Sequence, residues 1–465
     1  MKPESTTGSH WLTFRWVWQN LPNPAQKALT MTKPMLMAGA LRRLPLTAAL
    51  LSVCLLWSGA SLPAQMASSP PAVVVNADRL GSTLSAMVAD GRAAGVSVLI
   101  WKDGREAYFG SAGYSDREAK RPMTRDAIAQ IYSMTKPVTG VALMQLWEQG
   151  RFGLDDPLSR YLPSFESMQV YTGKDAAGQP TYRAASRPIT VRDIMRHTAG
   201  FAYGAGDTPA HDAYVKADPL ALDHDLTEMG RRLASVPLLF DPGTRWSYSI
   251  AVDVQALLVE TLSGQRFADY VRQHVFEPLG MRETAWRQPD ERLPRLAAVY
   301  RVKEGTLTRD TDEAARTLNF RDNRLTGGGF GLASTLDDYM RVARMLLNGG
   351  ELDGVRILRP STVRLMSTDQ LDPKVTERNF LPSKGSVGFR LDFAVRVSSP
   401  QKPEENRGAV GEFFWDGAAS TLFWVDPANH LAAVFFTQKM PFDGTLHRDI
   451  RKAVYGADYL EPPGN

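Results

Sequence analysis

The sequence predicts an α+β fold in which an antiparallel sheet, built from both ends of the chain, is flanked by helices. Strand-like segments occur before residue 112 and again after residue 387, and the stretch from about 125 to 320 follows a helical pattern. Strands separated in this way pair most simply as one sheet. We therefore expect two subdomains, which are an α/β sheet subdomain at 76–124 and 325–460 and a helical insertion subdomain at 125–324 that forms the other wall of a cleft.

The elements of this fold follow in chain order. Residues 76–94 have the spacing of an amphipathic helix, and an Asp-Gly turn separates two strands, Val96–Trp101 and Glu106–Ser111. The clearest helices after them are Ile131–Gly150, Ser249–Gly264, Ala333–Asn348 and His447–Val454. Alternating apolar residues predict late strands at Gly388–Val397, Gly411–Trp415, Ser420–Val425 and Leu431–Gln438. These late strands are expected to join the early hairpin in one sheet.

Composition and charge exclude two broad classes of protein. Of the 465 residues, 43% are hydrophobic and 22% are charged, which is ordinary for a globular protein and excludes a disordered or fibrous chain. The formal net charge of +4 would suit a nucleic-acid partner, but residues 1–64 alone carry +5, from Lys2, Arg15, Lys27, Lys33, Arg42 and Arg43 against Glu4. The rest of the chain therefore carries about −1, and we expect no nucleic-acid partner.

The basic excess belongs to a predicted leader at residues 1–64. Arg42-Arg43 precede an apolar run, Leu44–Trp57, and the small residues of Ser58–Ala64 follow it. This is the pattern of a secretory signal peptide, and the run is shorter than the ~20 residues that span a bilayer. We expect an exported, periplasmic or secreted protein with a linker at 65–75 and no stable membrane span after the leader is cleaved.

The single cysteine, Cys54, lies inside this apolar run. A mature chain without a thiol has no disulfide, no thiolate metal site and no cysteine nucleophile. Cys54 is also a candidate acceptor for a lipid anchor. Because Val53 is large for the position before such a cysteine, cleavage to a soluble protein is the favoured alternative and a lipoprotein is the other.

Ser133 and Lys136 have a spacing that suits nucleophilic catalysis. They open a predicted helix, in which residues three apart lie side by side, so the lysine amine is expected beside the serine hydroxyl. The unpaired N–H groups and positive dipole end of a first helical turn favour an alkoxide and lower the pKa of a lysine. The same spacing recurs at Ser399 and Lys402, but in a Pro/Glu-rich loop without a helix to align the pair, so we discard it.

Two further segments complete a resemblance to a known superfamily. Ser133–Lys136 is similar to the first motif of the serine β-lactamases and penicillin-binding proteins. Phe240–Ser249 resembles the second motif of class C β-lactamases and family VIII carboxylesterases, and Trp415-Asp416-Gly417 resembles the third. The supporting stretches are His197–Gly200, Phe276–Met281 and Leu325–Gly329. The resemblance covers nearly all of residues 76–460 and implies a β-lactamase/transpeptidase-like fold.

The sequence also departs from the β-lactamase pattern. Those enzymes have an asparagine two places after the motif tyrosine, where this chain has Ile250, and Lys-Thr-Gly is absent. Without the asparagine, the side-chain amide of a β-lactam lacks a partner. Asp416 stands where the esterases usually have a second glycine, and in a strand it should point opposite to Trp415 and Gly417. These departures favour small carboxylic esters over β-lactams.

The resemblance implies a role for each motif residue. Ser133 would attack an acyl carbonyl and form an ester intermediate. Lys136 would stay largely uncharged or share a proton with Tyr248, and Tyr248 would pass the proton to the leaving alcohol. The remaining implied roles are the oxyanion hole, from the backbone N–H groups of Ser133 and Ala418, and contacts to the substrate, from Trp415 and Gly417.

We expect no cofactor and no metal. The family uses His197 structurally, and the other histidines show no paired ligand spacing. No lysine follows the glycines at 327–329, so they predict a turn and not a phosphate cradle. The expected protein is a serine hydrolase that acts on small-molecule esters. The alternatives are a class C-like β-lactamase, a D-amino-acid peptidase or amidase, and a non-catalytic penicillin-binding sensor.

Overall fold

The computed structural model describes residues 73–204, 206–402, 404–456 and 459. The predicted leader, Cys54 and most of the predicted linker lie outside these residues, as do residues 403, 457, 458 and 460 of the predicted sheet subdomain. Among the residues described, no helix is long and apolar enough to cross a membrane.

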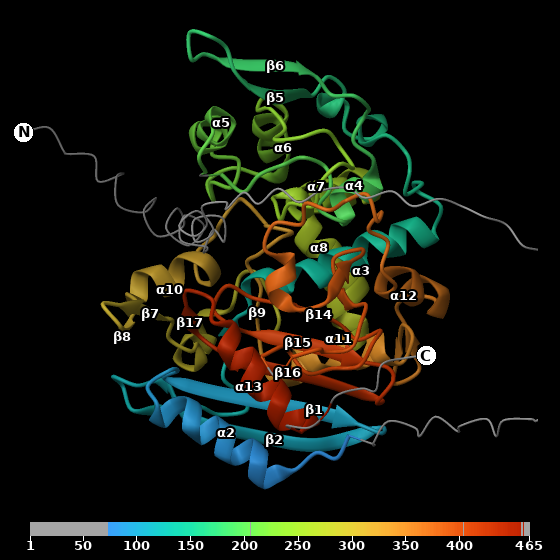
Figure 1. Cartoon of the computed structure of the whole chain (residues 1–465). Coiled ribbons are helices and arrows are strands. Elements are labelled where there is room, and N and C mark those ends of the chain that lie inside the picture. The colour runs from blue at the N-terminus through green and yellow to red at the C-terminus, as the bar shows by residue number, and fades with distance from the viewer. Residues whose placement is uncertain (1–72, 205, 403, 457–458, 460–465) are drawn as a thin grey trace, which may run out of the picture. The chain divides into compact units, whose positions relative to one another are not determined.

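An antiparallel sheet made from early and late segments of the chain is the centre of the fold (Figure 1). The early strand β1 (Gly95–Lys102) pairs with β2 (Arg105–Asp116) on one side and with the late strand β16 (Leu431–Thr437) on the other. In the described residues this sheet has eight strands in the order β12-β13-β14-β15-β16-β1-β2-β3, the others being β3 (Arg121–Pro122), β12 (Val387–Phe389), β13 (Ala394–Arg396), β14 (Phe413–Asp416) and β15 (Leu422–Asp426). The predicted α+β architecture is confirmed.

The single strand expected at Gly388–Val397 is instead a tight hairpin of β12 and β13. The chain reverses at Asp392, which has a left-handed φ of 66°. Aspartate tolerates this conformation better than most residues because its short polar side chain can hydrogen-bond locally. The apolar alternation runs through the turn, so the sequence did not reveal the reversal. The hairpin buries the Asp392 side chain completely.

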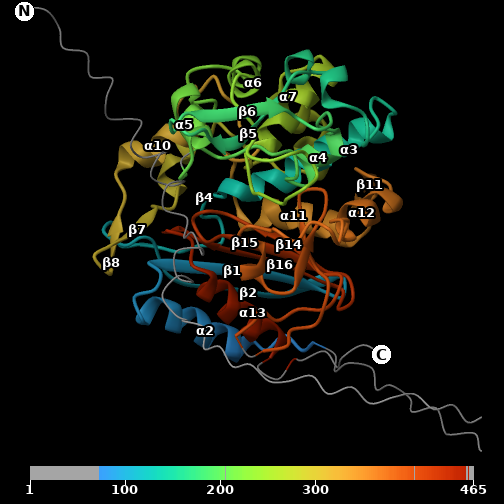
Figure 2. The same cartoon turned by 45° about the horizontal axis from the view of Figure 1, so that its top comes forward.

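Helices cover both faces of the sheet (Figure 2). On one face, α2 (Ala77–Ala89) and α13 (Gly444–Tyr455) contact each other, and on the other α11 (Leu336–Leu347) packs on β1, β15 and β16. The side chains that α2 buries are Leu80, Leu84 and Met87. Their spacing forms one apolar stripe along the helix, which is the pattern that predicts it.

The insertion between the early and late strands is helical at its centre. α3 (Thr135–Glu148) packs against α7 (Ala251–Ser263), which also contacts α4 (Val191–Met195) and α6 (Leu226–Ala234). Every residue of α3 from Thr135 to Met144 is buried. A helix that is apolar and buried all round lies in the interior of a protein. Polar side chains on α3 are therefore withdrawn from water.

Two hairpins within the insertion were not expected from its helical pattern. β5 (Gln169–Lys174) pairs with β6 (Pro180–Ala184), and β7 (Tyr300–Lys303) pairs with β8 (Thr306–Arg309). β7 also pairs with β17 (Lys439–Met440), which follows the last strand of the main sheet. These strands are short, and the two-residue turn between β7 and β8 has positive φ at both Glu304 (49°) and Gly305 (79°). The Gly305 position was the available sequence signal for this turn, since glycine adopts positive φ without steric cost.

Candidate active site

Ser133 lies in a tight turn directly before the buried helix α3. The turn, Tyr132–Met134, has 3₁₀ geometry and runs into α3 at Thr135, so Ser133 precedes the regular helix that it was expected to open. In 3₁₀ geometry, side chains three residues apart eclipse one another, which still aligns Lys136 with Ser133. Tyr132 has a φ of 44°, which is rare for an aromatic residue. Such backbone outliers concentrate at functional sites.

Lys136 is fully buried and its amine points at Ser133. Nζ lies 3.2 Å from Ser133 Oγ and donates a hydrogen bond to the Gly329 carbonyl oxygen at 2.7 Å. Burial lowers the pKa of Lys136 to about 7, although the charges of three buried aspartates oppose that change. A lysine with this pKa is partly uncharged at neutral pH, so it can accept the Ser133 proton.

The hydroxyl group of Tyr248 reaches the same serine. It interacts with the Ser133 side chain, and its oxygen accepts a hydrogen bond from Nε1 of the buried Trp415 at 3.3 Å. Lys136 Nζ lies 4.7 Å from the centre of the Tyr248 ring. Burial raises the pKa of Tyr248, so the hydroxyl is protonated at neutral pH. This arrangement suits a proton carrier between the serine and a bound substrate.

His197 packs behind Tyr248. The centroids of the two rings are 4.8 Å apart, and His197 Nδ1 accepts a hydrogen bond from the Ser249 backbone N–H at 3.3 Å. Burial lowers the pKa of His197 well below its usual value, so the ring is neutral. The position agrees with the structural role that the sequence implied for this residue.

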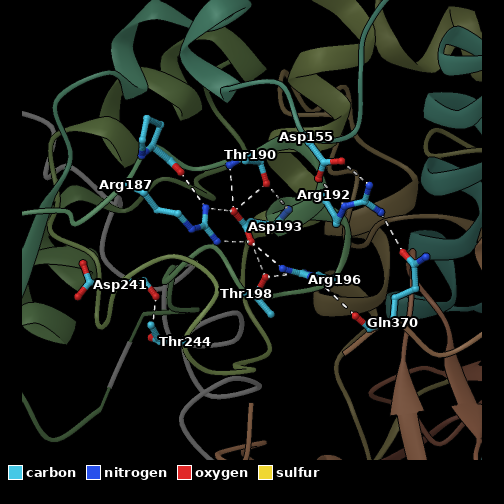
Figure 3. Close-up of polar contacts among 11 residues, drawn as sticks. Asp155, Arg187, Thr190, Arg192, Asp193, Arg196, Thr198, Asp241, Thr244 and Gln370 are labelled. Carbon is cyan, nitrogen blue, oxygen red and sulfur yellow. Dashed lines mark hydrogen bonds and ion pairs between the residues drawn. The ribbon is translucent and has the colours of Figure 1, made fainter. Parts of the chain in front are cut away.

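A polar network anchors the loop that carries His197 (Figure 3). The fully buried Asp193 at the start of α4 accepts hydrogen bonds from Arg187, Thr190, Arg196 and Thr198. The anchored loop then binds the second motif through its backbone, because the Gly243 N–H donates to the Thr198 carbonyl oxygen at 2.7 Å. The network therefore fixes the segment that presents Tyr248.

The third motif, at the end of β14, lies against the turn that holds Ser133. Gly417 has no room for a side chain, because a Cβ there would be 2.4 Å from the Ile131 carbonyl oxygen. The next residue, Ala418, and Tyr132 pack on the same apolar cluster. The two backbone segments of the predicted oxyanion hole, at Ser133 and Ala418, are thus side by side.

Comparison with known proteins assigns the chain to a family. The model of the family described as Beta-lactamase matches residues 80–456. The chain belongs to the beta-lactamase family.

Protein Rv1367c of Mycobacterium tuberculosis is 35% identical over 373 residues, covering 79% of this chain and 90% of that protein. Esterase EstB of Burkholderia gladioli is 29% identical over 403 residues, covering 82% of this chain and 95% of the esterase. A solved structure, that of EstCE1, a hydrolase with promiscuous acyltransferase activity, matches with a TM-score of 0.65 and 26% identity over 82% of this chain and 98% of that chain.

As a member of the beta-lactamase family, the protein is an enzyme of the serine hydrolase type, and the predicted β-lactamase/transpeptidase-like fold is confirmed. The structure brings Ser133, Lys136 and Tyr248 into mutual contact and places the third motif beside them. The individual roles stay predictions for Ser133, Lys136, Tyr248, Trp415, Gly417 and Ala418.

Asp253, in the first turn of α7, belongs to the site but was not predicted. It is fully buried, and Oδ1 accepts a hydrogen bond from the Gly329 N–H at 2.9 Å. Because the Gly329 carbonyl oxygen accepts from Lys136, the two side chains hold this glycine through its N–H and its C=O. Burial raises the pKa of the Asp253 carboxyl, and the Lys136 charge opposes the rise. An acid inside the apolar run Ala251–Val259 was the available sequence signal.

Tyr203 and Asp392 complete the buried surroundings of the Lys136 amine. Nζ lies 5.3 Å from the centre of the Tyr203 ring, and the centroids of the Tyr203 and Tyr248 rings are 5.3 Å apart. Asp392, at the β12–β13 turn, accepts a hydrogen bond from Gln255 at 3.0 Å, and burial raises the pKa of its carboxyl well above the usual value. Both residues come from loops distant in sequence from Lys136, so no local pattern marks them.

Proposed function

We propose that the protein hydrolyses small carboxylic esters through an acyl-enzyme formed on Ser133. The observation that carries the proposal is that two proton-carrying groups meet at one hydroxyl. Lys136 Nζ lies 3.2 Å from Ser133 Oγ, and the Tyr248 hydroxyl interacts with the same side chain. A serine with an adjacent base is activated for attack on an acyl group. The name of the relative EstB, an esterase, supports esters as the substrate class.

Acylation begins when the Ser133 oxygen bonds to the carbonyl carbon of the ester while Lys136 takes the serine proton. The carbonyl oxygen becomes an oxyanion, which the backbone N–H groups of Ser133 and Ala418 stabilise. When this intermediate collapses, the bond from carbon to the alcohol oxygen breaks. Tyr248 gives its proton to that oxygen and regains one from Lys136. The alcohol leaves, and the acyl group stays on Ser133.

Deacylation reverses these proton transfers with water in place of the alcohol. Tyr248 and Lys136 together take a proton from the water as its oxygen bonds to the acyl carbon. The new oxyanion occupies the same pair of N–H groups. The bond between the acyl carbon and Ser133 Oγ then breaks, Ser133 recovers its proton, and the carboxylic acid is released.

Two positions favour an ester over a β-lactam. Ile250 takes the place of the amide-bearing asparagine and is buried, so its side chain offers no hydrogen bond to a substrate amide. Trp415 takes the place of a lysine, and its indole N–H already donates to Tyr248. A lost hydrogen bond to a charged group costs about 1.5–3 kcal/mol, so a β-lactam should be a poor substrate. A class C-like β-lactamase and a D-amino-acid peptidase or amidase are the runner-up functions.

The proposed place of action is outside the cytoplasm. Support comes from the sequence of the leader, in which Arg42-Arg43, the apolar run Leu44–Trp57 and the small residues Ser58–Ala64 follow one another. We infer a signal peptide and an exported, periplasmic or secreted mature enzyme. A lipoprotein anchored at Cys54 is the alternative.

A parallel assay tests the proposed activity. The purified mature protein is given p-nitrophenyl butyrate, a chromogenic cephalosporin and a D-alanyl peptide, with Ser133→Ala as the inactive control. The butyrate ester should show the highest kcat/KM. Higher turnover of the cephalosporin or the peptide would replace the esterase proposal with one of the runner-up functions. Stoichiometric acylation without turnover of any substrate would identify a penicillin-binding sensor.

A further inference from the structure

The third motif carries a carboxylate that the catalytic scheme does not use. Asp416 lies between Trp415 and Gly417, and its carboxylate pairs with the Lys384 ammonium. The two side chains are only 11% and 7% exposed, respectively. Removing one partner of a buried ion pair leaves an uncompensated charge and lowers the stability of the fold, whereas replacing both partners lowers the stability far less. Asp416 and Lys384 are therefore expected to tolerate replacement together better than replacement singly.

Lys384 reaches this position from a separate segment, the short 3₁₀ turn Leu381–Lys384. Its Nζ lies 5.1 Å from the centre of the Trp415 ring, 5.5 Å from that of Phe380 and 4.7 Å from that of Phe442. A cation over the faces of aromatic rings is attracted to them. These rings and Asp416 thus confine the ammonium to one place.

The confined ammonium is linked to Tyr248 through Trp415. The indole Nε1 donates to the Tyr248 oxygen at 3.3 Å, and the two rings are 5.3 Å apart between centroids. Phe380, which neighbours Lys384 on the same segment, places its ring edge-on to Tyr248 at 5.3 Å. A displacement of Lys384 would therefore release two of the contacts that hold Tyr248.

Asp416 also acts on the site through its charge. Burial lowers the pKa of Lys136, and the Asp416 charge works in the opposite direction. Burial raises the pKa of Tyr248, and the same charge raises it further. An uncompensated Asp416 would therefore hold Lys136 in its protonated form, which cannot accept the Ser133 proton.

The other titratable groups near these residues do not cancel the negative charge of Asp416. In the part of the chain that the structure describes, the ion-pair partners of Asp416 are Lys384 and His447, the latter with 4.0 Å between Nδ1 and Oδ2. Burial lowers the pKa of His447 to about 4, so this ring is neutral at working pH. The other acids that act on Lys136 are Asp253 and Asp392, and burial raises the pKa of both carboxyls, that of Asp392 well above its usual value. Neither of them supplies a positive charge that would cancel the charge of Asp416.

We propose that Lys384 is a positioning residue of the active site, which neutralises the charge of Asp416 in the third motif and fixes the Trp415 indole against Tyr248. The inference rests on the proposed function in one respect, that Lys136 and Tyr248 act on Ser133. It also accounts for an acidic residue in the middle of the third motif, because Lys384 offsets that charge.

The test compares Lys384→Met, Asp416→Asn and the double variant with the wild type. Methionine keeps an unbranched stem among the rings but removes the charge. The control is Lys102→Met, which breaks a lysine–aspartate pair of 2.6 Å at the β1–β2 turn. Two readouts are taken across pH, the rate at which a fluorophosphonate labels Ser133 and kcat/KM for p-nitrophenyl butyrate. Labelling reports the reactivity of Ser133 whatever the natural substrate is.

Lys384→Met should move the acidic limb of both profiles to higher pH by about one unit. At a given pH on that limb, the labelling rate and kcat/KM should therefore fall about tenfold. Asp416→Asn should move the limb in the opposite direction, because the Lys384 charge is then unbalanced. The double variant should return the limb to within about 0.3 pH units of the wild type. Lys102→Met should match the wild type throughout.

Three results would overturn the proposal. They are an unchanged limb in Lys384→Met, a double variant displaced as far as Lys384→Met, or an Asp416→Asn limb that moves upward. If Lys384→Met does not fold, the proposal is decided by Asp416→Asn alone, according to whether its acidic limb moves to lower or to higher pH. A wild type that is labelled at Ser133 but does not turn over the ester would end the esterase proposal, while the labelling profiles would still test Lys384.

Discussion

The Gly329 carbonyl oxygen accepts a hydrogen bond from Lys136 Nζ at 2.7 Å, and this contact sets the direction of the buried amine. Gly329 ends the glycine run that precedes β9 (Ala333–Ser334) and α11, far from Lys136 in sequence. Its own N–H donates to Asp253 at 2.9 Å, so α3 and α7 are joined through one residue. The base of the site is therefore aligned by a backbone group and not only by its spacing from Ser133.

This geometry predicts that Gly329→Ala is harmful. An added Cβ would lie 2.8 Å from Asp253 Oδ2, 3.1 Å from Lys136 Nζ and 3.2 Å from the Tyr203 hydroxyl oxygen. We expect kcat to fall at least tenfold and the unfolding free energy to fall by about 1–3 kcal/mol. Kinetics and urea unfolding measure both. The control is Gly81→Ala in α2, where the nearest atom would be at an ordinary 3.7 Å. A Gly329→Ala enzyme with wild-type kcat would contradict this account.

The pH dependence should follow the charge on Lys136. Its pKa is lowered to about 7 by burial, and in the proposed mechanism the uncharged amine is the form that accepts the Ser133 proton. The uncharged fraction grows as pH rises through that pKa. Below it, kcat/KM should increase about tenfold per pH unit, and above it kcat/KM should level off. A profile with its limb near about 10, the usual pKa of a lysine, would show that Lys136 is not buried in the working enzyme.

Ser133→Ala should remove essentially all turnover, because Ser133 supplies the hydroxyl that lies 3.2 Å from Lys136 Nζ and would form the acyl-enzyme. The matched control is Ser399→Ala. Ser399 repeats the Ser-x-x-Lys spacing but lies in a segment without helix or strand. Mass spectrometry after fluorophosphonate treatment should place the label on Ser133. Labelling at Ser399, or full activity of Ser133→Ala, would refute the nucleophile.

Tyr248→Phe should fold normally and lose most activity. The ring contacts with His197 and Trp415 are kept, while the hydroxyl that interacts with Ser133 is removed. Removal of a general acid–base group typically costs ~100-fold or more, so kcat/KM for p-nitrophenyl butyrate should fall by that order. Thermal unfolding serves as the control for folding. A loss of less than about tenfold would assign the proton to another group.

Export predicts a shortened native protein. Mass spectrometry of the protein from its own cells should find an N-terminus near Gln65, after the small residues Ser58–Ala64. A diacylglyceryl group on Cys54 would establish the lipoprotein alternative. An intact leader would contradict export.

Much of the fold, and the contact between Ser133 and Lys136, were predictable because they depend on the spacing of residues close together in the sequence. Ser133 and Lys136 are three residues apart, and both 3₁₀ and α geometry place such side chains together. The apolar stripe of α2 and the alternation in β14, β15 and β16 likewise mark elements whose period is local. The hairpin at Asp392 was misjudged because a reversal at one left-handed residue leaves the alternation intact.

The amino-acid sequence by itself determined the spacing of Ser133 and Lys136, the three motifs, their order and the class of fold, since each depends on residue type and local period. The tertiary structure alone decided which distant groups complete the site, namely Gly329, Asp253, Tyr203 and Lys384. It also decided the charge of Lys136, because the pKa of a lysine falls only when packing removes the amine from water. The burial of the Lys136 amine and the meeting of distant residues around it are properties of the packed chain. No short segment of the sequence contains them.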